Sequence, residues 1–138
     1  MTDPAPSGRR IDIEDWRRIW EQPDLDAIRL ISADDLEVTA VTAAIEPRHY
    51  QGREAAVQWL VELNERLGGD WSVDQVLRLA DDVVVVEGEL RFAEPTTTGA
   101  ESQPFAILMR LRDDKVRWIG TFMNVAAARE AWELGVGA

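Results

Sequence analysis

The sequence predicts an α+β fold, in which helices dominate the first half and paired strands the second. The stretch from Asp81 to Phe92 is the main reason: its four consecutive valines, residues 83–86, would lose χ1 freedom in a helix and favour a strand. A valine run without alternation is typical of a strand that is apolar on both faces. The Asp81-Asp82 pair before it favours a turn, and Gly88 inside it indicates a bend.

The bulk composition is that of one globular domain. The 138 residues suffice for a hydrophobic core, and 46% of them are hydrophobic. A net charge of −11 disfavours nucleic acid and anionic membranes as partners, since both require Lys and Arg. Cysteine is absent, and no apolar run approaches the roughly 20 residues of a membrane span. We expect a cytoplasmic protein without cofactor or metal, with a disordered tail at 1–10 and one domain at 11–138.

The first 42 residues predict two helices and a strand. Asp12 can cap the first helix, which Pro23 ends, and Asp24 can cap a shorter second helix. The segment 32–35 is expected to be a turn, and 36–42 alternates loosely as a strand. The apolar stripes of the two helices are Ile13, Trp16, Ile19 and Trp20, and then Leu25, Ile28 and Ile31.

The longest helix follows a predicted loop. Residues 46–51 include Pro47 and are expected to form that loop, after which Gly52 opens the helix. The run at 68–70, Gly-Gly-Asp, ends it. Its apolar stripe consists of Ala56, Trp59, Leu60, Leu63 and Leu67.

A four-stranded meander and a short helix complete the chain. The predicted strands are 71–80, the valine strand, 104–112 and 115–123, and 94–102 is a polar loop. Pairs of aspartates supply both tight turns, at 81–82 and 113–114. Asn124 can cap the closing helix, which Gly135 ends.

Four motifs in this order resemble the SnoaL-like branch of the nuclear transport factor 2-like superfamily. They are Tyr50-Gln51-Gly52-Arg53-Glu54-Ala55, the valine strand at 81–88, the hairpin at 111–116 and the alanine-rich helix at 124–131. The resemblance covers roughly residues 12–135 and implies a cone: a strongly curved, mixed or antiparallel sheet wrapped around the long helix, with a pocket at its open end. The branch includes isomerases, cyclases, dehydratases, epoxide hydrolases and proteins without known activity, so the fold does not fix the function.

Large apolar side chains from several elements are candidates for lining that pocket. An aromatic lining with few polar groups is typical of small-molecule sites, although the same side chains could simply fill a core. We expect the ligand-binding residues to be Trp16, Trp20, Tyr50, Trp59, Met109, Trp118 and Asn124.

Candidates for acid–base catalysis are weak. The resemblance implies a carboxylate near the end of the first strand, where this chain has Ala40 or Val41, or an aspartate after the last strand, where it has Asn124. An amide cannot take a proton at neutral pH, although it can bind a carbonyl or enol oxygen. Histidine is the residue type that most often serves as a general base, but the single one, His49, lies in the predicted loop beside Tyr50. His49, Tyr50 and Asn124 are therefore the candidate catalytic residues.

The face of the sheet away from the long helix predicts a homodimer. Strict alternation along the last three strands leaves one apolar patch on that face, consisting of Val83, Val85, Ala106, Leu108 and Ile119. Bare patches of this kind are commonly buried in a two-fold contact; the alternative is that the C-terminal helix or the 94–102 loop covers it. The same alternation places Arg110 and Arg112 outside, where we expect solvated cross-strand pairs with the charges of the valine strand.

Three hypotheses remain open on the sequence alone. The first is a module that binds a small, mostly apolar molecule in the cone. The second is an isomerase, cyclase or hydrolase that acts on a small hydrophobic cyclic substrate. The third is a structural dimer whose cone is filled. An ionisable group in the cavity favours the enzyme, a cavity without carboxylates favours the binder, and no cavity favours the third.

Overall fold

The computed structural model describes residues 16–18, 20, 25–42, 45–67, 70–91, 99 and 101–138. Residues 16–18 and 20 are helical, as the tryptophan spacing predicts, whereas the tail at 1–10 and the predicted caps Asp12 and Asp24 lie outside the described residues. The following helices are α2 (Leu25–Ile31), α3 (Arg53–Leu67) and α4 (Val125–Glu133). The strands are β1 (Ser32–Thr42), β2 (Ile45–Gln51), β3 (Asp70–Ala80), β4 (Val83–Arg91), β5 (Ser102–Arg112) and β6 (Lys115–Phe122).

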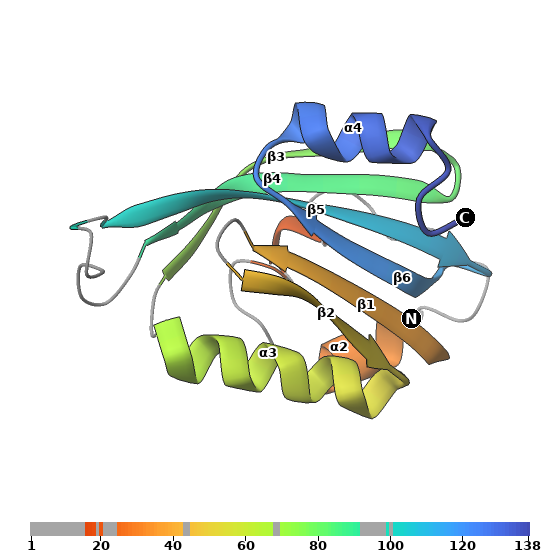
Figure 1. The fold of residues 1–138 in the computed structure, drawn as a ribbon. Coiled ribbons are helices and arrows are strands. Elements are labelled where there is room, and N and C mark those ends of the chain that lie inside the picture. The colour runs from red at the N-terminus through yellow and green to blue at the C-terminus, as the bar shows by residue number, and fades with distance from the viewer. Residues whose placement is uncertain are drawn as a thin grey trace, which may run out of the picture.

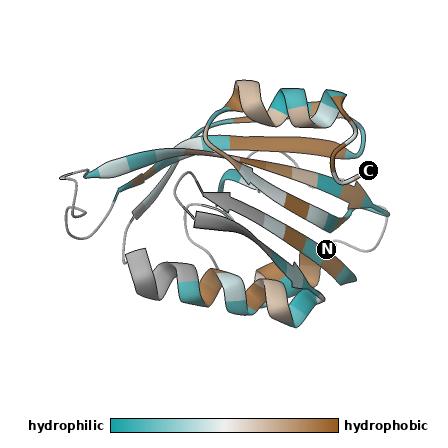
Figure 2. Cartoon of the chain, viewed as in Figure 1, coloured by the Kyte–Doolittle hydropathy of each residue, from teal (hydrophilic) through white to brown (hydrophobic). Residues whose placement is uncertain are grey.

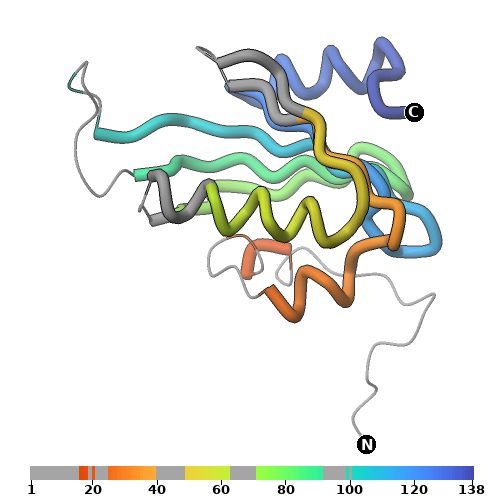
Figure 3. Tube along the Cα trace, turned by 60° about the horizontal axis from the view of Figure 1, so that its bottom comes forward, coloured from red at the N-terminus to blue at the C-terminus, as the bar shows by residue number. Residues whose placement is uncertain are grey.

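All six strands belong to one curved sheet with helices on both faces, which confirms the predicted α+β class. The strand order is β2-β1-β6-β5-β4-β3. The meander from β3 to β6 is antiparallel, and β1 joins β6 in parallel, so the sheet is mixed. Helices α2 and α3 lie side by side against one face, here called the inner face, and α4 lies against the opposite, outer face (Figures 1 and 3).

Two segments of the first half are strands rather than the turn and loop that the sequence predicts. Strand β1 begins at Ser32, directly after α2, and at this junction the Ser32 hydroxyl donates to the Ile28 carbonyl 2.5 Å away. Residues 45–51 form β2 despite Pro47, since β2 is an edge strand and proline is tolerated at an edge. Gly52, with a φ of +95°, then starts α3 as expected and donates its N–H to the Leu36 carbonyl at 2.7 Å.

The valine strand is buried on both faces, as predicted. Val83, Val84, Val85 and Val86 expose at most 1% of their surface, and the brown stripe along β4 in Figure 2 marks them. Val84 and Val86 belong to the main core between the sheet and α2–α3, and Val83 and Val85 face α4. The main core also contains Trp16, Leu36, Val38, Leu60, Ile107 and Met109.

Helix α4 covers the patch that was expected to be bare. Within the chain, Val83, Val85, Ala106 and Leu108 are at most 1% exposed. The fifth predicted patch residue, Ile119, is on the inner face in the main core. The homodimer stays a prediction, but the surface proposed for it is occupied by the chain's own helix. The outer core so formed consists of Val83, Val85, Ala106, Leu108, Trp118, Ala128 and Ala131.

A β-bulge explains why Ile119 and Trp118 exchange the faces predicted for them. Leu111 of β5 pairs with Val116 of β6, but Arg110 pairs with Trp118, so Arg117 is one extra residue in β6. An extra residue reverses the alternation beyond it. Strict alternation from Val116 would send Trp118 inward, and the bulge sends it outward.

The C-terminal turn closes over Trp118. Gly135 has a φ of +79°, and the bonds from Gly135 N–H to the Trp132 carbonyl and from Val136 N–H to the Ala131 carbonyl form a Schellman motif. Gly137 lies so close to the indole that a Cβ there would meet Trp118 Cδ2 at 2.4 Å.

Two arginines bind this turn to the sheet, and for one of them the structure corrects the predicted exposure. Arg110 Nε donates to the Val136 carbonyl and Arg117 Nη1 to the Gly137 carbonyl, each at 2.9 Å. Arg110 is buried, with 7% exposed, rather than solvated in a cross-strand ion pair, and its strand partner is Val83. Burial first, and Arg117 second, lower the pKa of Arg110.

A charge introduced at Leu108 tests whether the outer core is packed within one chain or forms a contact between two subunits. We expect Leu108→Glu to lower the free energy of unfolding by roughly 3 kcal/mol or more, because a carboxyl group would be buried beneath α4 without a partner. Leu134→Glu is the control, since Leu134 is 74% exposed and its replacement should cost at most about 0.5 kcal/mol. Urea unfolding measures both, with sedimentation equilibrium in parallel. A Leu108→Glu protein of unchanged stability but halved mass would instead identify the patch as a dimer contact.

Candidate functional site

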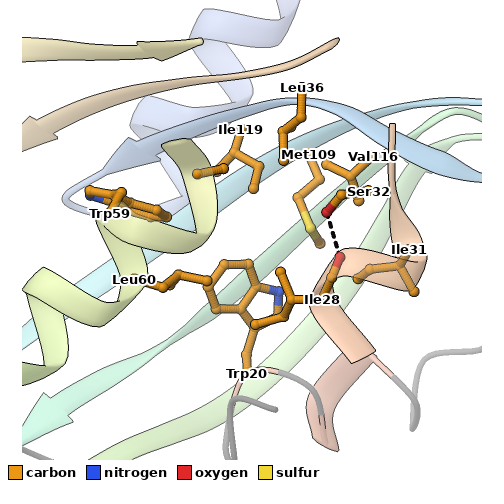
Figure 4. Close-up of a pocket in the computed structure, with 11 residues that line it drawn as sticks. Trp20, Ile28, Ile31, Ser32, Leu36, Trp59, Leu60, Met109, Val116 and Ile119 are labelled. Carbon is orange, nitrogen blue, oxygen red and sulfur yellow. Dashed lines mark hydrogen bonds between the residues drawn. The ribbon is translucent and has the colours of Figure 1, made fainter. Parts of the chain in front are cut away.

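A small cavity lies inside the main core, between helices α2 and α3 and the inner face of the sheet. Its lining comes from α2, α3, β1, β5 and β6, together with one tryptophan from the helical residues that precede α2 (Figure 4). The lining residues are Trp20, Ile28, Ile31, Ser32, Leu36, Ala56, Trp59, Leu60, Met109, Val116 and Ile119.

Local sequence patterns explain why these side chains converge. Ile28 and Ile31 are three residues apart on α2, and Ala56, Trp59 and Leu60 share one face of α3 at helical spacing. On the sheet, Met109 pairs with Val84 and faces inward with it. Val116 and Ile119 both face inward because of the bulge between them.

The cavity is almost wholly apolar. None of its lining side chains is ionisable, and Ser32 contributes the single hydroxyl. That hydroxyl already donates to the Ile28 carbonyl, as the dashed line in Figure 4 marks, so it can offer only its lone pairs. Trp20 is 3% exposed, and its Nε1 has no hydrogen-bond partner within the described part of the chain. Such a lining can bind apolar groups but cannot itself supply a general acid or base.

The cavity is also narrow. The space open to the centre of a water-sized sphere is about 10 Å³, close to the minimum that one water molecule needs. Ligand pockets for drug-sized molecules are larger, roughly 300–1,000 Å³. Among the described residues, this cavity is therefore far smaller than the pocket that the resemblance implies.

Three of the predicted ligand-binding residues line the cavity: Trp20, Trp59 and Met109. Trp16 belongs to the same main core without lining the cavity, and is 1% exposed. Tyr50 is half-buried and packs beside Trp59, with ring centroids 6.4 Å apart. These five lie on the inner side as expected, although whether any of them binds a ligand stays a prediction.

The remaining candidates lie elsewhere. Trp118 faces the outer core. His49 is exposed, and its Nδ1 lies 3.3 Å from Thr39 Oγ1. These two residues pair on the outer face of the sheet, because the neighbouring strand pair Val38–Tyr50 faces the inner core. Asn124 is exposed as well, and its Oδ1 accepts the Ala127 N–H at 2.8 Å, which makes it the N-cap of α4. Neither His49 nor Asn124 borders the cavity.

Eight of the eleven lining residues are not among the predicted ligand-binding residues, and Ser32 and Ile119 are the two whose positions the sequence pattern misplaces. Ser32 was expected in a turn; the signal that could have placed it is its spacing of four from Ile28, at which a serine hydroxyl can bond back to a helix carbonyl. Ile119 depends on the bulge at Arg117. No residue near Arg117 would allow this bulge to be predicted from the sequence.

Ion pairs connect neighbouring elements outside the cavity. Arg29 pairs with Glu54 at 3.2 Å and joins α2 to α3, and Arg112 pairs with Asp35 at 2.5 Å and joins β5 to β1. These groups are largely exposed, so each pair contributes little to stability. The hydrogen bond from Arg112 nevertheless holds the pKa of Asp35 below its usual range. Across the described ranges, no three His, Asp or Glu side chains gather as metal ligands, and no helix is long and apolar enough to cross a membrane.

The family model of the SnoaL-like domain matches residues 13–119. Among curated proteins, no match to the chain is found.

Solved structures show the same fold at low sequence identity. A candidate SnoaL-like polyketide cyclase from Jannaschia sp. CCS1 is 20% identical, with a TM-score of 0.65 over 89% of this chain and 95% of its own. An NTF2-like protein of unknown function from Mesorhizobium loti is 15% identical, with a TM-score of 0.64 over 80% and 86%. A ketosteroid isomerase-like protein from Catenulispora acidiphila, in complex with trimethylamine, is 17% identical, with a TM-score of 0.58 over 82% and 85%.

The role of Asn124 can be separated from catalysis by two substitutions. We expect Asn124→Ala to lower the free energy of unfolding by about 1 kcal/mol, because the Ala127 N–H loses its acceptor. Asn124→Asp should retain wild-type stability, since aspartate caps as well as asparagine and its charge suits a helix N-terminus. Urea denaturation compares the three proteins. Equal stability of the Ala and Asp variants would refute a capping role.

The Asp35–Arg112 pair predicts a pH effect with a defined sign. Because the folded-state pKa of Asp35 is depressed, the pair stabilises the fold above the ordinary aspartate pKa, roughly pH 4, and loses that contribution as pH falls through the lower folded value. Carboxyl-carbon NMR titration should show Asp35 moving toward its usual pKa in Arg112→Met. Arg91→Met removes an equal charge from β4 and should leave Asp35 unchanged. A matching shift in both variants would point to net charge rather than the pair.

Proposed function

We propose, given that this chain belongs to the SnoaL-like domain family, that it binds a small, mostly apolar molecule in the main-core cavity. The observation that carries the proposal is the lining: eleven residues from five elements and the preceding helical segment converge on one space without an ionisable side chain among them. Apolar walls with few polar groups are how small-molecule sites are usually built. The trimethylamine complex of the Catenulispora neighbour supports small-molecule binding by proteins of this fold.

The narrowness of the cavity restricts the ligand and the way it enters. With space for about one water molecule, the cavity must widen before a ring can bind. Met109 is unbranched and adapts its shape readily, and Leu60 and Ile28 approach from two separate helices. We infer that binding moves α2 and α3 apart from each other or from the sheet, which favours a ligand of one ring over an extended one.

Catalysis is the alternative, and the described site gives it less support. A general acid or base must reach the reacting atoms within hydrogen-bond distance. The cavity has no ionisable lining residue, and His49 and Asn124 are exposed away from it. Tyr50, beside Trp59, is the remaining candidate from the sequence, and its phenol could act as a hydrogen-bond donor to a carbonyl oxygen.

A filled cone is the second alternative, and the small cavity volume is the observation that favours it. In that case Trp20 and Trp59 only contribute apolar burial, and ligands gain no access. The two possibilities differ in one measurable property, which is whether the folded protein is stabilised by an added apolar molecule.

Thermal unfolding with a panel of single-ring hydrophobic compounds tests the proposal. At a hundred-fold excess over its dissociation constant, a ligand should raise Tm by roughly 5–10 °C. Ala56→Leu fills the cavity from α3 and should abolish the Tm shift. Ala55→Leu, at the preceding position and outside the lining, should retain it. No shift in the wild-type protein with any compound would reject binding in favour of the filled cone. Conversion of a bound compound, followed by mass spectrometry or NMR, would support the enzyme instead.

A further inference from the structure

We infer that the ligand of this cavity is neutral and carries one hydrogen-bond acceptor, such as a ketone oxygen, which the indole N–H of Trp20 binds. The inference rests on the proposed function and names the class of molecule. It begins from Trp20, a lining residue whose indole N–H is buried and has no hydrogen-bond partner in the described part of the chain.

Trp20 supplies that donor. Its side chain is 3% exposed, and its Nε1 is buried with no partner in the described part of the chain. Buried N–H groups are nearly always paired, because they give up a hydrogen bond to water on folding. In Figure 4 the indole of Trp20 lies among the lining residues, with its nitrogen on the side of Ile28. A ligand acceptor placed there would satisfy a group that the protein leaves unsatisfied.

The remaining lining fixes the charge of the ligand. A carboxylate or an ammonium group would enter a space without any counter-charge, and burial of an unpaired charge is strongly unfavourable. The Ser32 hydroxyl uses its hydrogen on the Ile28 carbonyl and therefore cannot donate to the same ligand. The nitrogen of Trp59 is not among the buried atoms without partners. A lining with one unused hydrogen-bond donor and no charged side chain favours a neutral ligand that has a single hydrogen-bond acceptor.

Trp16 provides a matched control within the same helical stretch. It lies one helical turn from Trp20, is 1% exposed, and also has a buried Nε1 without a hydrogen-bond partner among the described residues. It does not line the cavity. If unpaired indoles were only a cost of filling the core, replacing either tryptophan would affect ligand selection alike.

The test uses two probes of nearly the same shape, acetophenone and α-methylstyrene, which differ by a carbonyl oxygen in place of a methylene group. Isothermal titration or fluorescence gives their dissociation constants. We expect wild-type protein and Trp16→Phe to bind acetophenone at least tenfold more tightly than α-methylstyrene. In Trp20→Phe the preference should disappear or reverse, since the ketone then loses its donor but keeps its desolvation cost.

Each result decides the inference. Equal or tighter binding of α-methylstyrene to the wild type overturns it while leaving the proposed function standing, and failure of both probes to bind overturns the two together. Loss of the preference in Trp16→Phe as well would show that Trp20 does not select the ligand. Should Trp20→Phe not fold, proton NMR of the wild type decides: the Trp20 indole N–H should move downfield with acetophenone but not with α-methylstyrene, and equal shifts would refute the inference.

Discussion

The pairing of β4 with β5, apolar on both faces, is the constraint on which the rest of the molecule depends. Val84 opposite Met109 and Val85 opposite Leu108 leave neither face of the sheet able to meet water. A sheet of this kind needs a layer on each side. Helices α2 and α3 provide one layer and α4 the other, so two separate cores arise from a single pair of strands.

The cavity is a by-product of how the inner layer is filled. Large indoles from one helical stretch and from α3 meet branched aliphatic side chains of α2 and the sheet, and shapes so different pack without filling every gap. At the positions where the resemblance implies a catalytic base, this chain has Ala40 or Val41 and Asn124, and Asn124 is the N-cap of α4.

Sequence reasoning predicted the fold and three of the eleven residues that line the cavity, and there is a physical reason for what it missed. Periodicity over many residues identified α3, the meander and both apolar faces of β4, because each pattern repeats the same signal. Single-residue events were missed. The bulge at Arg117 reverses the faces of Trp118 and Ile119, and β1 begins directly after α2 at Ser32, where the sequence predicts a turn. Both depend on one backbone position whose choice is set by tertiary contacts.

The two cores share no side chain, and this has a consequence for how the molecule opens. Helix α4 contributes two buried alanines and the partly buried Val125 and Trp132 to the outer core, and Arg110 and Arg117 bind carbonyls of the last turn. The inner core buries a larger number of large side chains. Local opening should therefore be graded, with α4 detaching at a lower free energy than global unfolding. Amide hydrogens of α4 would then exchange with solvent well before those of β4 and β5, and the protein would pass through a form that exposes the outer face of its sheet while the inner cavity stays intact.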